Sequence, residues 1–164
     1  YLIGYLFLFF SFYSIYILRN EYPGDYLYFL LITSICILTD IGGYIFGKVL
    51  KGPKLTKYSP NKTYSGMLGA YTLAILFTSI LFNNDIFFLN ETETNLNSLI
   101  FVFVISTVSQ LGDILISYFK RLSNIKDTGT IIPGHGGLLD RVDGMIFAFP
   151  FSFMILSVSG FQYF

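Results

Sequence analysis

The feature that most constrains this chain is a set of five long apolar stretches, separated by four more polar connections. The stretches are residues 1–18, 26–50, 66–82, 99–119 and 142 to about 161. Each is close to the roughly 20 residues that an α-helix needs to cross the hydrocarbon core of a bilayer. They are too long and too uniformly apolar for the alternating strands of a membrane β-barrel. The sequence therefore predicts an all-α, polytopic membrane helical bundle with about five transmembrane helices.

Composition supports a membrane protein and argues against a nucleic-acid partner. Only 12% of the 164 residues are charged, whereas a soluble domain usually carries about 25%. The formal net charge is zero, so no overall field attracts nucleic acid. The single cysteine, Cys36, excludes an internal disulfide and a multi-cysteine metal site, and we interpret it as a small buried hydrophobic residue.

Basic residues fix the expected orientation, because they gather at two of the four connections. The second connection has a lysine cluster in or beside it, formed by Lys48, Lys51, Lys54, Lys57 and Lys62. The fourth contains Lys120, Arg121, Lys126 and Arg141. All charged residues of the third connection are acidic, and the first connection has a single basic residue, Arg19. By the positive-inside rule, the second and fourth connections face the cytoplasm. We therefore expect a multi-pass protein of a bacterial-type inner membrane, with its second and fourth connections in the cytoplasm.

Two acids interrupt the apolar stretches and are candidates for a polar interior. Asp40 lies in the second stretch, and Asp113 lies six residues before the end of the fourth, about 9 Å along a helix. A carboxylate inside the bilayer is costly, so it usually faces a polar cavity and a partner. Asp40 shares a helical face with Tyr44, and Asp113 shares one with Ser117. Hydrogen bonding between helices is the structural alternative, and an ion path is a functional one.

The fourth connection has the composition of a phosphate site. Four cations flank a loop with glycines at 129, 134, 136 and 137, and glycines let backbone N–H groups converge on phosphate oxygens. Asp140 and Asp143 are three residues apart, so they point the same way if the fifth helix starts there. Mg²⁺ prefers one or two carboxylates together with phosphate oxygens. An ordinary basic loop followed by a capped helix is the alternative, but it leaves the acids around Gly-His-Gly-Gly unexplained.

Residues 117–143 also resemble the signature of the phosphatidate cytidylyltransferase (CDP-diacylglycerol synthase) family. The signature is S-x-hydrophobic-K-R, four residues, K-D-x-G, a P-x-H-G-G turn and a closing D-R-x-D, and every specified position is met. The resemblance extends to Asp113 and to Asp40 and Tyr44. Residues 59–66 are similar to the family's S-P-K-K-T-x-E-G loop, with departures at Asn61 and Ser65. Because family members have more N-terminal spans, we expect residues 1–164 to be one membrane domain in the C-terminal part of a longer enzyme.

The resemblance implies transfer of the cytidylyl group of CTP to phosphatidic acid, with Mg²⁺ as cofactor and room for a second cation. It implies Asp113 and Asp140 as the metal ligands, with Asp143 as a further candidate. The expected phosphate-binding cations are Lys120, Arg121, Lys126 and Arg141. The expected substrate-binding residues are Ser59, Lys62, Thr63, Asp40, Tyr44, Ser117, Gly136 and Gly137. His135 is a candidate catalytic acid, and a structural hydrogen bond within the turn is its alternative role.

The expected partners are CTP, phosphatidic acid and membrane lipid, and a homodimer is a further expectation. Three other functions stay open. Related enzymes use CTP with other lipid phosphates or lipid alcohols, which generic apolar spans cannot distinguish. A transporter would use Asp40 and Asp113 as an ion path but leaves the phosphate-type loop unexplained. An inactive relative would retain only a role in association.

Overall fold

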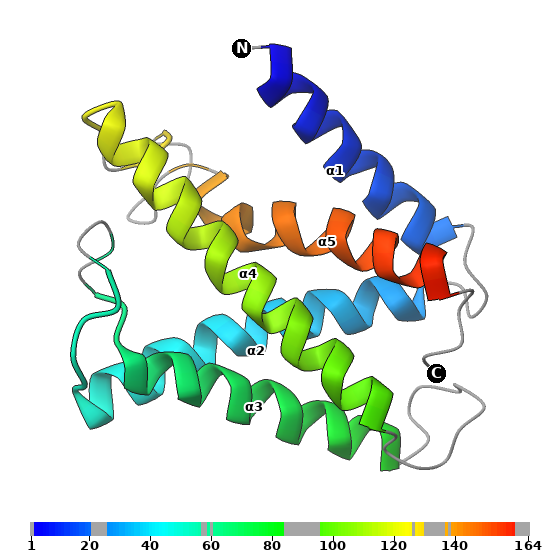
Figure 1. Cartoon of the computed structure of the whole chain (residues 1–164), viewed down its shortest axis with the longest axis horizontal. Coiled ribbons are helices and arrows are strands. Elements are labelled where there is room, and N and C mark those ends of the chain that lie inside the picture. Colours follow the sequence, from blue (N-terminus) through cyan, green and yellow to red (C-terminus); the bar gives the residue numbers. More distant parts are fainter. Residues whose placement is uncertain are drawn as a thin grey trace.

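The computed structural model describes residues 2–20, 26–56, 59, 61–83, 96–125, 127–129, 137 and 139–159. These residues form five α-helices (Figure 1), namely α1 (Leu2–Asn20), α2 (Leu27–Leu50), α3 (Tyr64–Asn83), α4 (Leu96–Leu122) and α5 (Leu139–Ser159). All five are long and apolar enough to cross a membrane. No β-strand occurs in the described ranges, apart from an isolated bridge between Lys54 and Thr63. The predicted all-α membrane bundle is thus confirmed.

Helix boundaries depart slightly from the apolar stretches, for reasons of capping and charge. α3 begins two residues earlier than predicted because the Thr63 hydroxyl accepts a hydrogen bond from the Gly66 N–H (3.1 Å), as an N-cap does. α4 continues beyond its apolar stretch, and its last turn contains Lys120 and Arg121. Cations are favourable there because the C-terminal end of a helix carries partial negative charge.

α2 and α3 form a tightly packed antiparallel pair (Figure 1). A Cβ atom added to Gly42 would lie 2.7 Å from the Gly69 carbonyl oxygen, and one added to Gly66 would lie 2.6 Å from the Gly43 carbonyl oxygen. The two backbones therefore touch through glycines. Small residues permit this close approach between membrane helices, where packing replaces the hydrophobic effect as the main source of association.

α1 joins the bundle through a polar contact that a proline makes necessary. Pro150 lies inside α5 and has no N–H, so the Ile146 carbonyl lacks its usual helical donor. The buried Ser11 hydroxyl of α1 lies 2.9 Å from this carbonyl and 2.9 Å from the Phe7 carbonyl of its own helix, so it shares its proton between the two. Because hydrocarbon offers no alternative donor, the contact satisfies a backbone group that would otherwise be costly.

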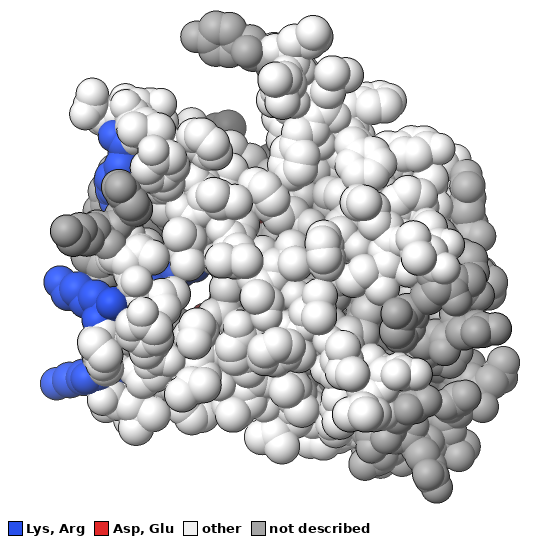
Figure 2. Space-filling model, viewed as in Figure 1, with Lys and Arg blue, Asp and Glu red and all other residues white. Residues whose placement is uncertain are grey.

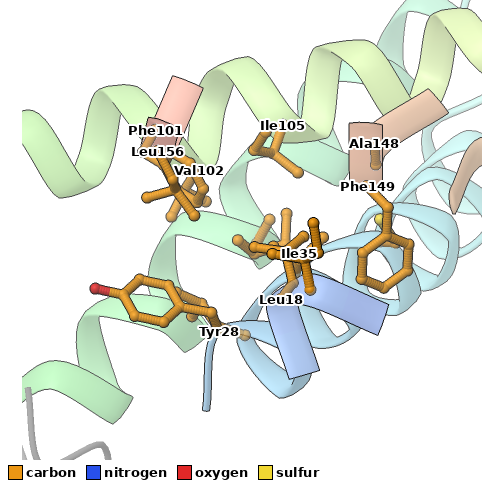
Figure 3. Close-up of a cluster of buried hydrophobic side chains, with 14 residues drawn as sticks. Leu18, Tyr28, Ile35, Phe101, Val102, Ile105, Ala148, Phe149 and Leu156 are labelled. Atoms are coloured by element: carbon orange, nitrogen blue, oxygen red, sulfur yellow. The ribbon is translucent and has the colours of Figure 1, made fainter. Parts of the chain in front are cut away.

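The hydrophobic core and the polar residues occupy opposite halves of the bundle. Figure 3 shows core side chains from α1, α2, α4 and α5, including Leu18, Ile35, Phe101, Ile105 and Phe149. The cluster comes from the end of α1, the first half of α2 and α4, and the middle and second half of α5, with Ala74 from the middle of α3. The other half of the bundle is therefore free to hold charged residues without disturbing this core.

The two basic connections lie at one end of the molecule. In Figure 1, α2 and α4 end where α3 and α5 begin, and in Figure 2 the lysine and arginine side chains of the visible face gather at this same end. This arrangement agrees with the expectation that the second and fourth connections lie on the same side of the membrane.

Candidate functional site

Charged side chains from five parts of the chain line one cavity of about 420 Å³ at the basic end of the bundle. Its described carboxylates belong to Asp40, Asp113, Asp127, Asp140 and Asp143. Its described cations belong to Lys62, Lys120 and Arg141. Five acids against three bases give these residues a formal charge of −2 when all of them are ionised. Cavities of a few hundred Å³ are the size that binds small molecules.

The second connection brings a lysine to an acid in the fourth helix. Lys62 forms an ion pair with Asp113, and both side chains are about three-quarters buried. The connection holds Lys62 from both sides, since the Leu55 N–H donates to the Lys62 carbonyl (2.8 Å) and the Lys62 N–H donates to the Ser59 carbonyl (3.1 Å). Ser117 donates to the other Asp113 oxygen at 3.4 Å. Asp113 is therefore held between its own helix and the second connection.

Lys120 links the fourth and fifth helices. Its Nζ lies 2.9 Å from Asp140 Oδ1 and 3.8 Å from Asp143 Oδ2. The side chains of all three residues are at most 14% exposed. One lysine thus holds together the two acids that begin α5, which confirms that α5 starts early enough for both to point into the same space.

Asp140 also holds the fourth connection in place. Its Oδ2 accepts the backbone N–H groups of Thr128 and Gly137, both at 2.8 Å. A Cβ atom on Gly137 would lie 2.8 Å from the Gly129 nitrogen, so only glycine allows these two parts of the connection to approach so closely. The two oxygens of Asp140 therefore have different roles, one toward the backbone and one toward Lys120.

A polar network forms the membrane side of the cavity. The Thr39 hydroxyl of α2 donates to the Ser106 hydroxyl of α4 at 2.8 Å, and Gln110 donates to the same hydroxyl at 3.4 Å. Thr39 and Gln110 line the cavity together with Asp40. The sequence analysis did not single out Thr39 or Ser106. The signal was present, since Ser106, Gln110 and Asp113 follow one another at helical spacings of four and three.

Comparison with known proteins assigns the chain to a family. The model of the cytidylyltransferase family matches residues 1–159. The chain belongs to the cytidylyltransferase family. The prediction made from residues 117–143 is therefore confirmed at the level of the family.

Several curated relatives of this cytidylyltransferase-family chain are named phosphatidate cytidylyltransferase. The one from Rickettsia bellii is 44% identical over 135 residues, which cover 79% of this chain and 55% of the relative. The one from Brucella suis is 36% identical over 140 residues, covering 85% and 50%. The one from Staphylococcus haemolyticus is 38% identical over 132 residues, covering 77% and 48%. The chain spans about half the length of these relatives.

The cavity of this cytidylyltransferase-family chain brings together most of the described residues predicted for the site. Ser59, Thr63 and Tyr44 line it in addition to the residues above. Thr63 has a second function as the cap of α3. Lys126, His135 and Gly136 lie outside the described residues, so their predicted roles stay predictions.

Arg121 is placed differently from Lys120. It is exposed, it does not line the cavity, and its Nη1 donates to the Ile125 carbonyl at 3.4 Å. On an ideal helix, Lys120 lies about 20° around the axis from Asp113, whereas Arg121 lies about 80° away. Helical angles could therefore have favoured Lys120 over Arg121 as the cation that meets the acids. A role of Arg121 in phosphate binding stays a prediction.

The carboxylates of the cavity fit a hard divalent cation that arrives with phosphate. In the described part of the chain, no three His, Cys, Asp or Glu side chains form a ready-made metal cluster. Mg²⁺ does not require one, because it is commonly bound through one or two carboxylates plus substrate phosphates. Asp113 and Asp140, on facing helices of one cavity, offer such a pair, with Asp143 beside them.

Proposed function

We propose that this chain carries the cytidylyl-transfer site of a phosphatidate cytidylyltransferase. In this reaction CTP and phosphatidic acid give CDP-diacylglycerol and pyrophosphate. The observation that carries the proposal is the convergence of Lys62, Lys120 and Arg141 with paired acids in one cavity of a membrane bundle. The names of the relatives supply the substrates.

The proposed chemistry needs charge neutralisation more than proton transfer. A phosphomonoester has a second pKa of about 6, so the phosphate of phosphatidic acid is already an anion near neutral pH. One of its oxygens attacks the α-phosphorus of CTP, and the bond from that phosphorus to the oxygen bridging to the β-phosphate breaks. Pyrophosphate leaves with the electron pair. The main obstacle is repulsion between two polyanions, which positioned cations reduce.

We propose Mg²⁺ as the cofactor, held by Asp113 and by Oδ1 of Asp140, with Asp143 next to them. The formal charge of −2 among the described cavity residues is one that a divalent cation would balance. When bound, Mg²⁺ would neutralise phosphate charge and orient the phosphate groups. Oδ2 of Asp140 could keep its two backbone hydrogen bonds throughout, because only Oδ1 is needed as a ligand.

In the same proposal, Lys62 and Lys120 exchange partners when substrate arrives. Without substrate they neutralise Asp113 and Asp140. With nucleotide bound, their ammonium groups turn to phosphate oxygens, which are the stronger anionic partners. Each lysine then serves as a point charge on a flexible stem, which suits such a movement.

We also propose that the cavity faces the cytoplasm of a bacterial cell, where CTP is available, and that the protein forms a homodimer. The positive-inside rule supports this orientation. Cys36 is buried and so leaves a clean background for a reporter cysteine. A Lys51→Cys variant should react with a membrane-impermeant maleimide only after the inner membrane is opened. Labelling in intact spheroplasts would show that the opposite orientation holds. A monomeric mass in mild detergent would contradict the proposed homodimer.

The reaction is tested with purified protein, labelled CTP, Mg²⁺ and phosphatidic acid. The expected products are labelled lipid and pyrophosphate in equal amounts. Asp113→Asn is the matched control, because it keeps the shape of the side chain and removes the proposed ligand charge. It should remain folded in the membrane fraction and lose turnover by at least about a hundredfold. Equal turnover in both proteins would overturn the metal assignment, and no labelled lipid from the unaltered protein would overturn the function.

A further inference from the structure

The cavity reaches the membrane-facing surface at Tyr44. This side chain lines the cavity and yet is 67% exposed. Its neighbours on α2, Ile41 and Ile45, are 43% and 45% exposed. Exposed isoleucines on a membrane-spanning helix face lipid, because exposing a continuous apolar surface to water is energetically unfavourable. Tyr44 therefore stands at the border between the polar cavity and the lipid.

A cation stands beside Tyr44 at this border. Lys48 follows one helical turn later, its Nζ donates to the Tyr44 hydroxyl at 3.3 Å, and it lies 5.4 Å from the centre of the ring. Lys48 is in the last turn of α2 and is exposed. None of the carboxylates in the described part of the chain forms an ion pair with it. Its charge is therefore free to attract an anion at the membrane surface.

A path leads from this pair to the cations of the cavity. Gly47, between Tyr44 and Lys48, packs against the second connection, and a Cβ atom added to it would lie 3.1 Å from Thr63 Oγ1. Lys62 directly precedes Thr63 and projects into the cavity toward Asp113. Tyr44 and Lys62 line the same cavity, so a phosphate that enters at Tyr44 reaches the space that Lys62 faces. Gly43, next to Tyr44, also lines the cavity and adds no side chain to it.

We propose that Lys48 and Tyr44 form the headgroup site where the phosphate of phosphatidic acid leaves the membrane surface and enters the cavity. The inference rests on the proposed function, since it names how the lipid substrate of that reaction is received. A phosphomonoester carries a charge of about −1.5 to −2 at pH 7. Lysine supplies the opposite charge, and the Tyr44 hydroxyl, which accepts a hydrogen bond from Lys48, still has its own proton to donate. A tyrosine suits this depth, because its ring is compatible with lipid and its hydroxyl with the headgroup region.

The variants are Lys48→Gln and Tyr44→Phe, with Lys51→Gln as the matched control. Lys51 is also exposed at the end of α2 but does not contact Tyr44 or the cavity. An interfacial lysine contributes roughly fivefold to the affinity for an anionic lipid. Lys48→Gln should therefore raise the KM for long-chain phosphatidic acid about fivefold, with the KM for CTP and kcat within a factor of two. Tyr44→Phe should raise the same KM about tenfold, as expected for loss of a hydrogen bond to a charged group.

Two results would overturn the headgroup site while leaving the proposed function intact. One is an equal rise of the phosphatidic acid KM in Lys48→Gln and Lys51→Gln, which would indicate general surface charge. The other is a rise in the KM for CTP alone, which would indicate that Lys48 binds the nucleotide and not the lipid headgroup.

Direct binding separates the headgroup site from failure of the reaction itself. Soluble dihexanoyl phosphatidic acid, dihexanoyl phosphatidylcholine and inorganic phosphate are each titrated into the detergent-purified protein. Lys48→Gln should weaken binding of the first ligand about fivefold, and Lys51→Gln should not. This pattern supports the site even if the protein makes no labelled lipid. Unchanged affinity for dihexanoyl phosphatidic acid, with or without weaker binding of inorganic phosphate, would overturn it.

Discussion

Replacing Asp140 by asparagine should loosen the fourth connection as well as stop turnover. The side chain is 6% exposed and receives three hydrogen bonds, one from Lys120 at 2.9 Å and two from the backbone N–H groups of Thr128 and Gly137 at 2.8 Å. Asparagine has one oxygen and one NH₂ group. In either orientation its NH₂ group faces a donor, which is Lys120 in one case and the two backbone N–H groups in the other.

The cost follows from these contacts. Loss of the Lys120 bond costs about 1.5–3 kcal/mol, the usual contribution of a hydrogen bond to a charged group. The two remaining bonds lose their charge assistance, which roughly halves each of them, or about 1 kcal/mol apiece. The Lys120 bond joins α4 to α5, so only the two backbone bonds hold the connection, which Asp140→Asn therefore weakens by about 2 kcal/mol. The exchange of the Thr128 and Gly137 amides with solvent should then rise by about thirtyfold.

Hydrogen–deuterium exchange followed by mass spectrometry measures this effect on peptides that cover residues 123–139. Asp113→Asn is the control, because Asp113 makes no hydrogen bond to the fourth connection among the contacts of the described residues. Both variants should lose turnover, but only Asp140→Asn should exchange faster in these peptides. Unchanged exchange in Asp140→Asn would refute the anchoring role of Oδ2. Equally fast exchange in both variants would show that any loss of charge in the cavity loosens the connection.

Three further predictions concern the bundle and the cavity. Ser11→Ala should destabilise the protein by about 1–2 kcal/mol in thermal unfolding in detergent, because it leaves a carbonyl of α5 without a donor. Among the described residues the Ser14 hydroxyl bonds only within α1, so Ser14→Ala should have a smaller effect, and equal effects would contradict this explanation. Gly42→Ala should lower the free energy of unfolding by about 1–3 kcal/mol, since its Cβ would lie 2.7 Å from a backbone oxygen of α3. The control is Gly43→Ala, which should melt like the unaltered protein, because the nearest atom to a Cβ at Gly43 is 3.9 Å away. Lys62→Gln should raise the KM for CTP about tenfold, by loss of a charged phosphate contact, and an unchanged KM would exclude this lysine from nucleotide binding.

The sequence by itself determined the membrane architecture and the family. The five helices follow from the lengths of the apolar stretches. Every segment that crosses the bilayer needs about 20 apolar residues and must satisfy its own backbone hydrogen bonds, whatever its neighbours are. The gathering of basic residues at one end followed from their positions along the chain, since antiparallel neighbours bring alternate connections together. Residues 117–143 identified the family, because their spacing lies within one continuous segment.

Only the tertiary structure decided which charged residues meet. Asp113 is paired with Lys62, which lies 51 residues earlier, and Lys120 is shared by Asp140 and Asp143 across two helices. These pairings depend on the rotation and relative height of neighbouring helices, which small residues at the contacts set and which no local pattern encodes.

The structure also decided how single side chains divide their roles. The sequence predicted Asp140 as a metal ligand, and the structure adds that one of its oxygens is occupied by the backbone of the fourth connection. The sequence placed Tyr44 in a polar cavity, and the structure adds that the same ring borders the lipid beside Lys48. A sequence records the chemistry that a side chain offers, whereas only packing determines which neighbours receive each of its atoms.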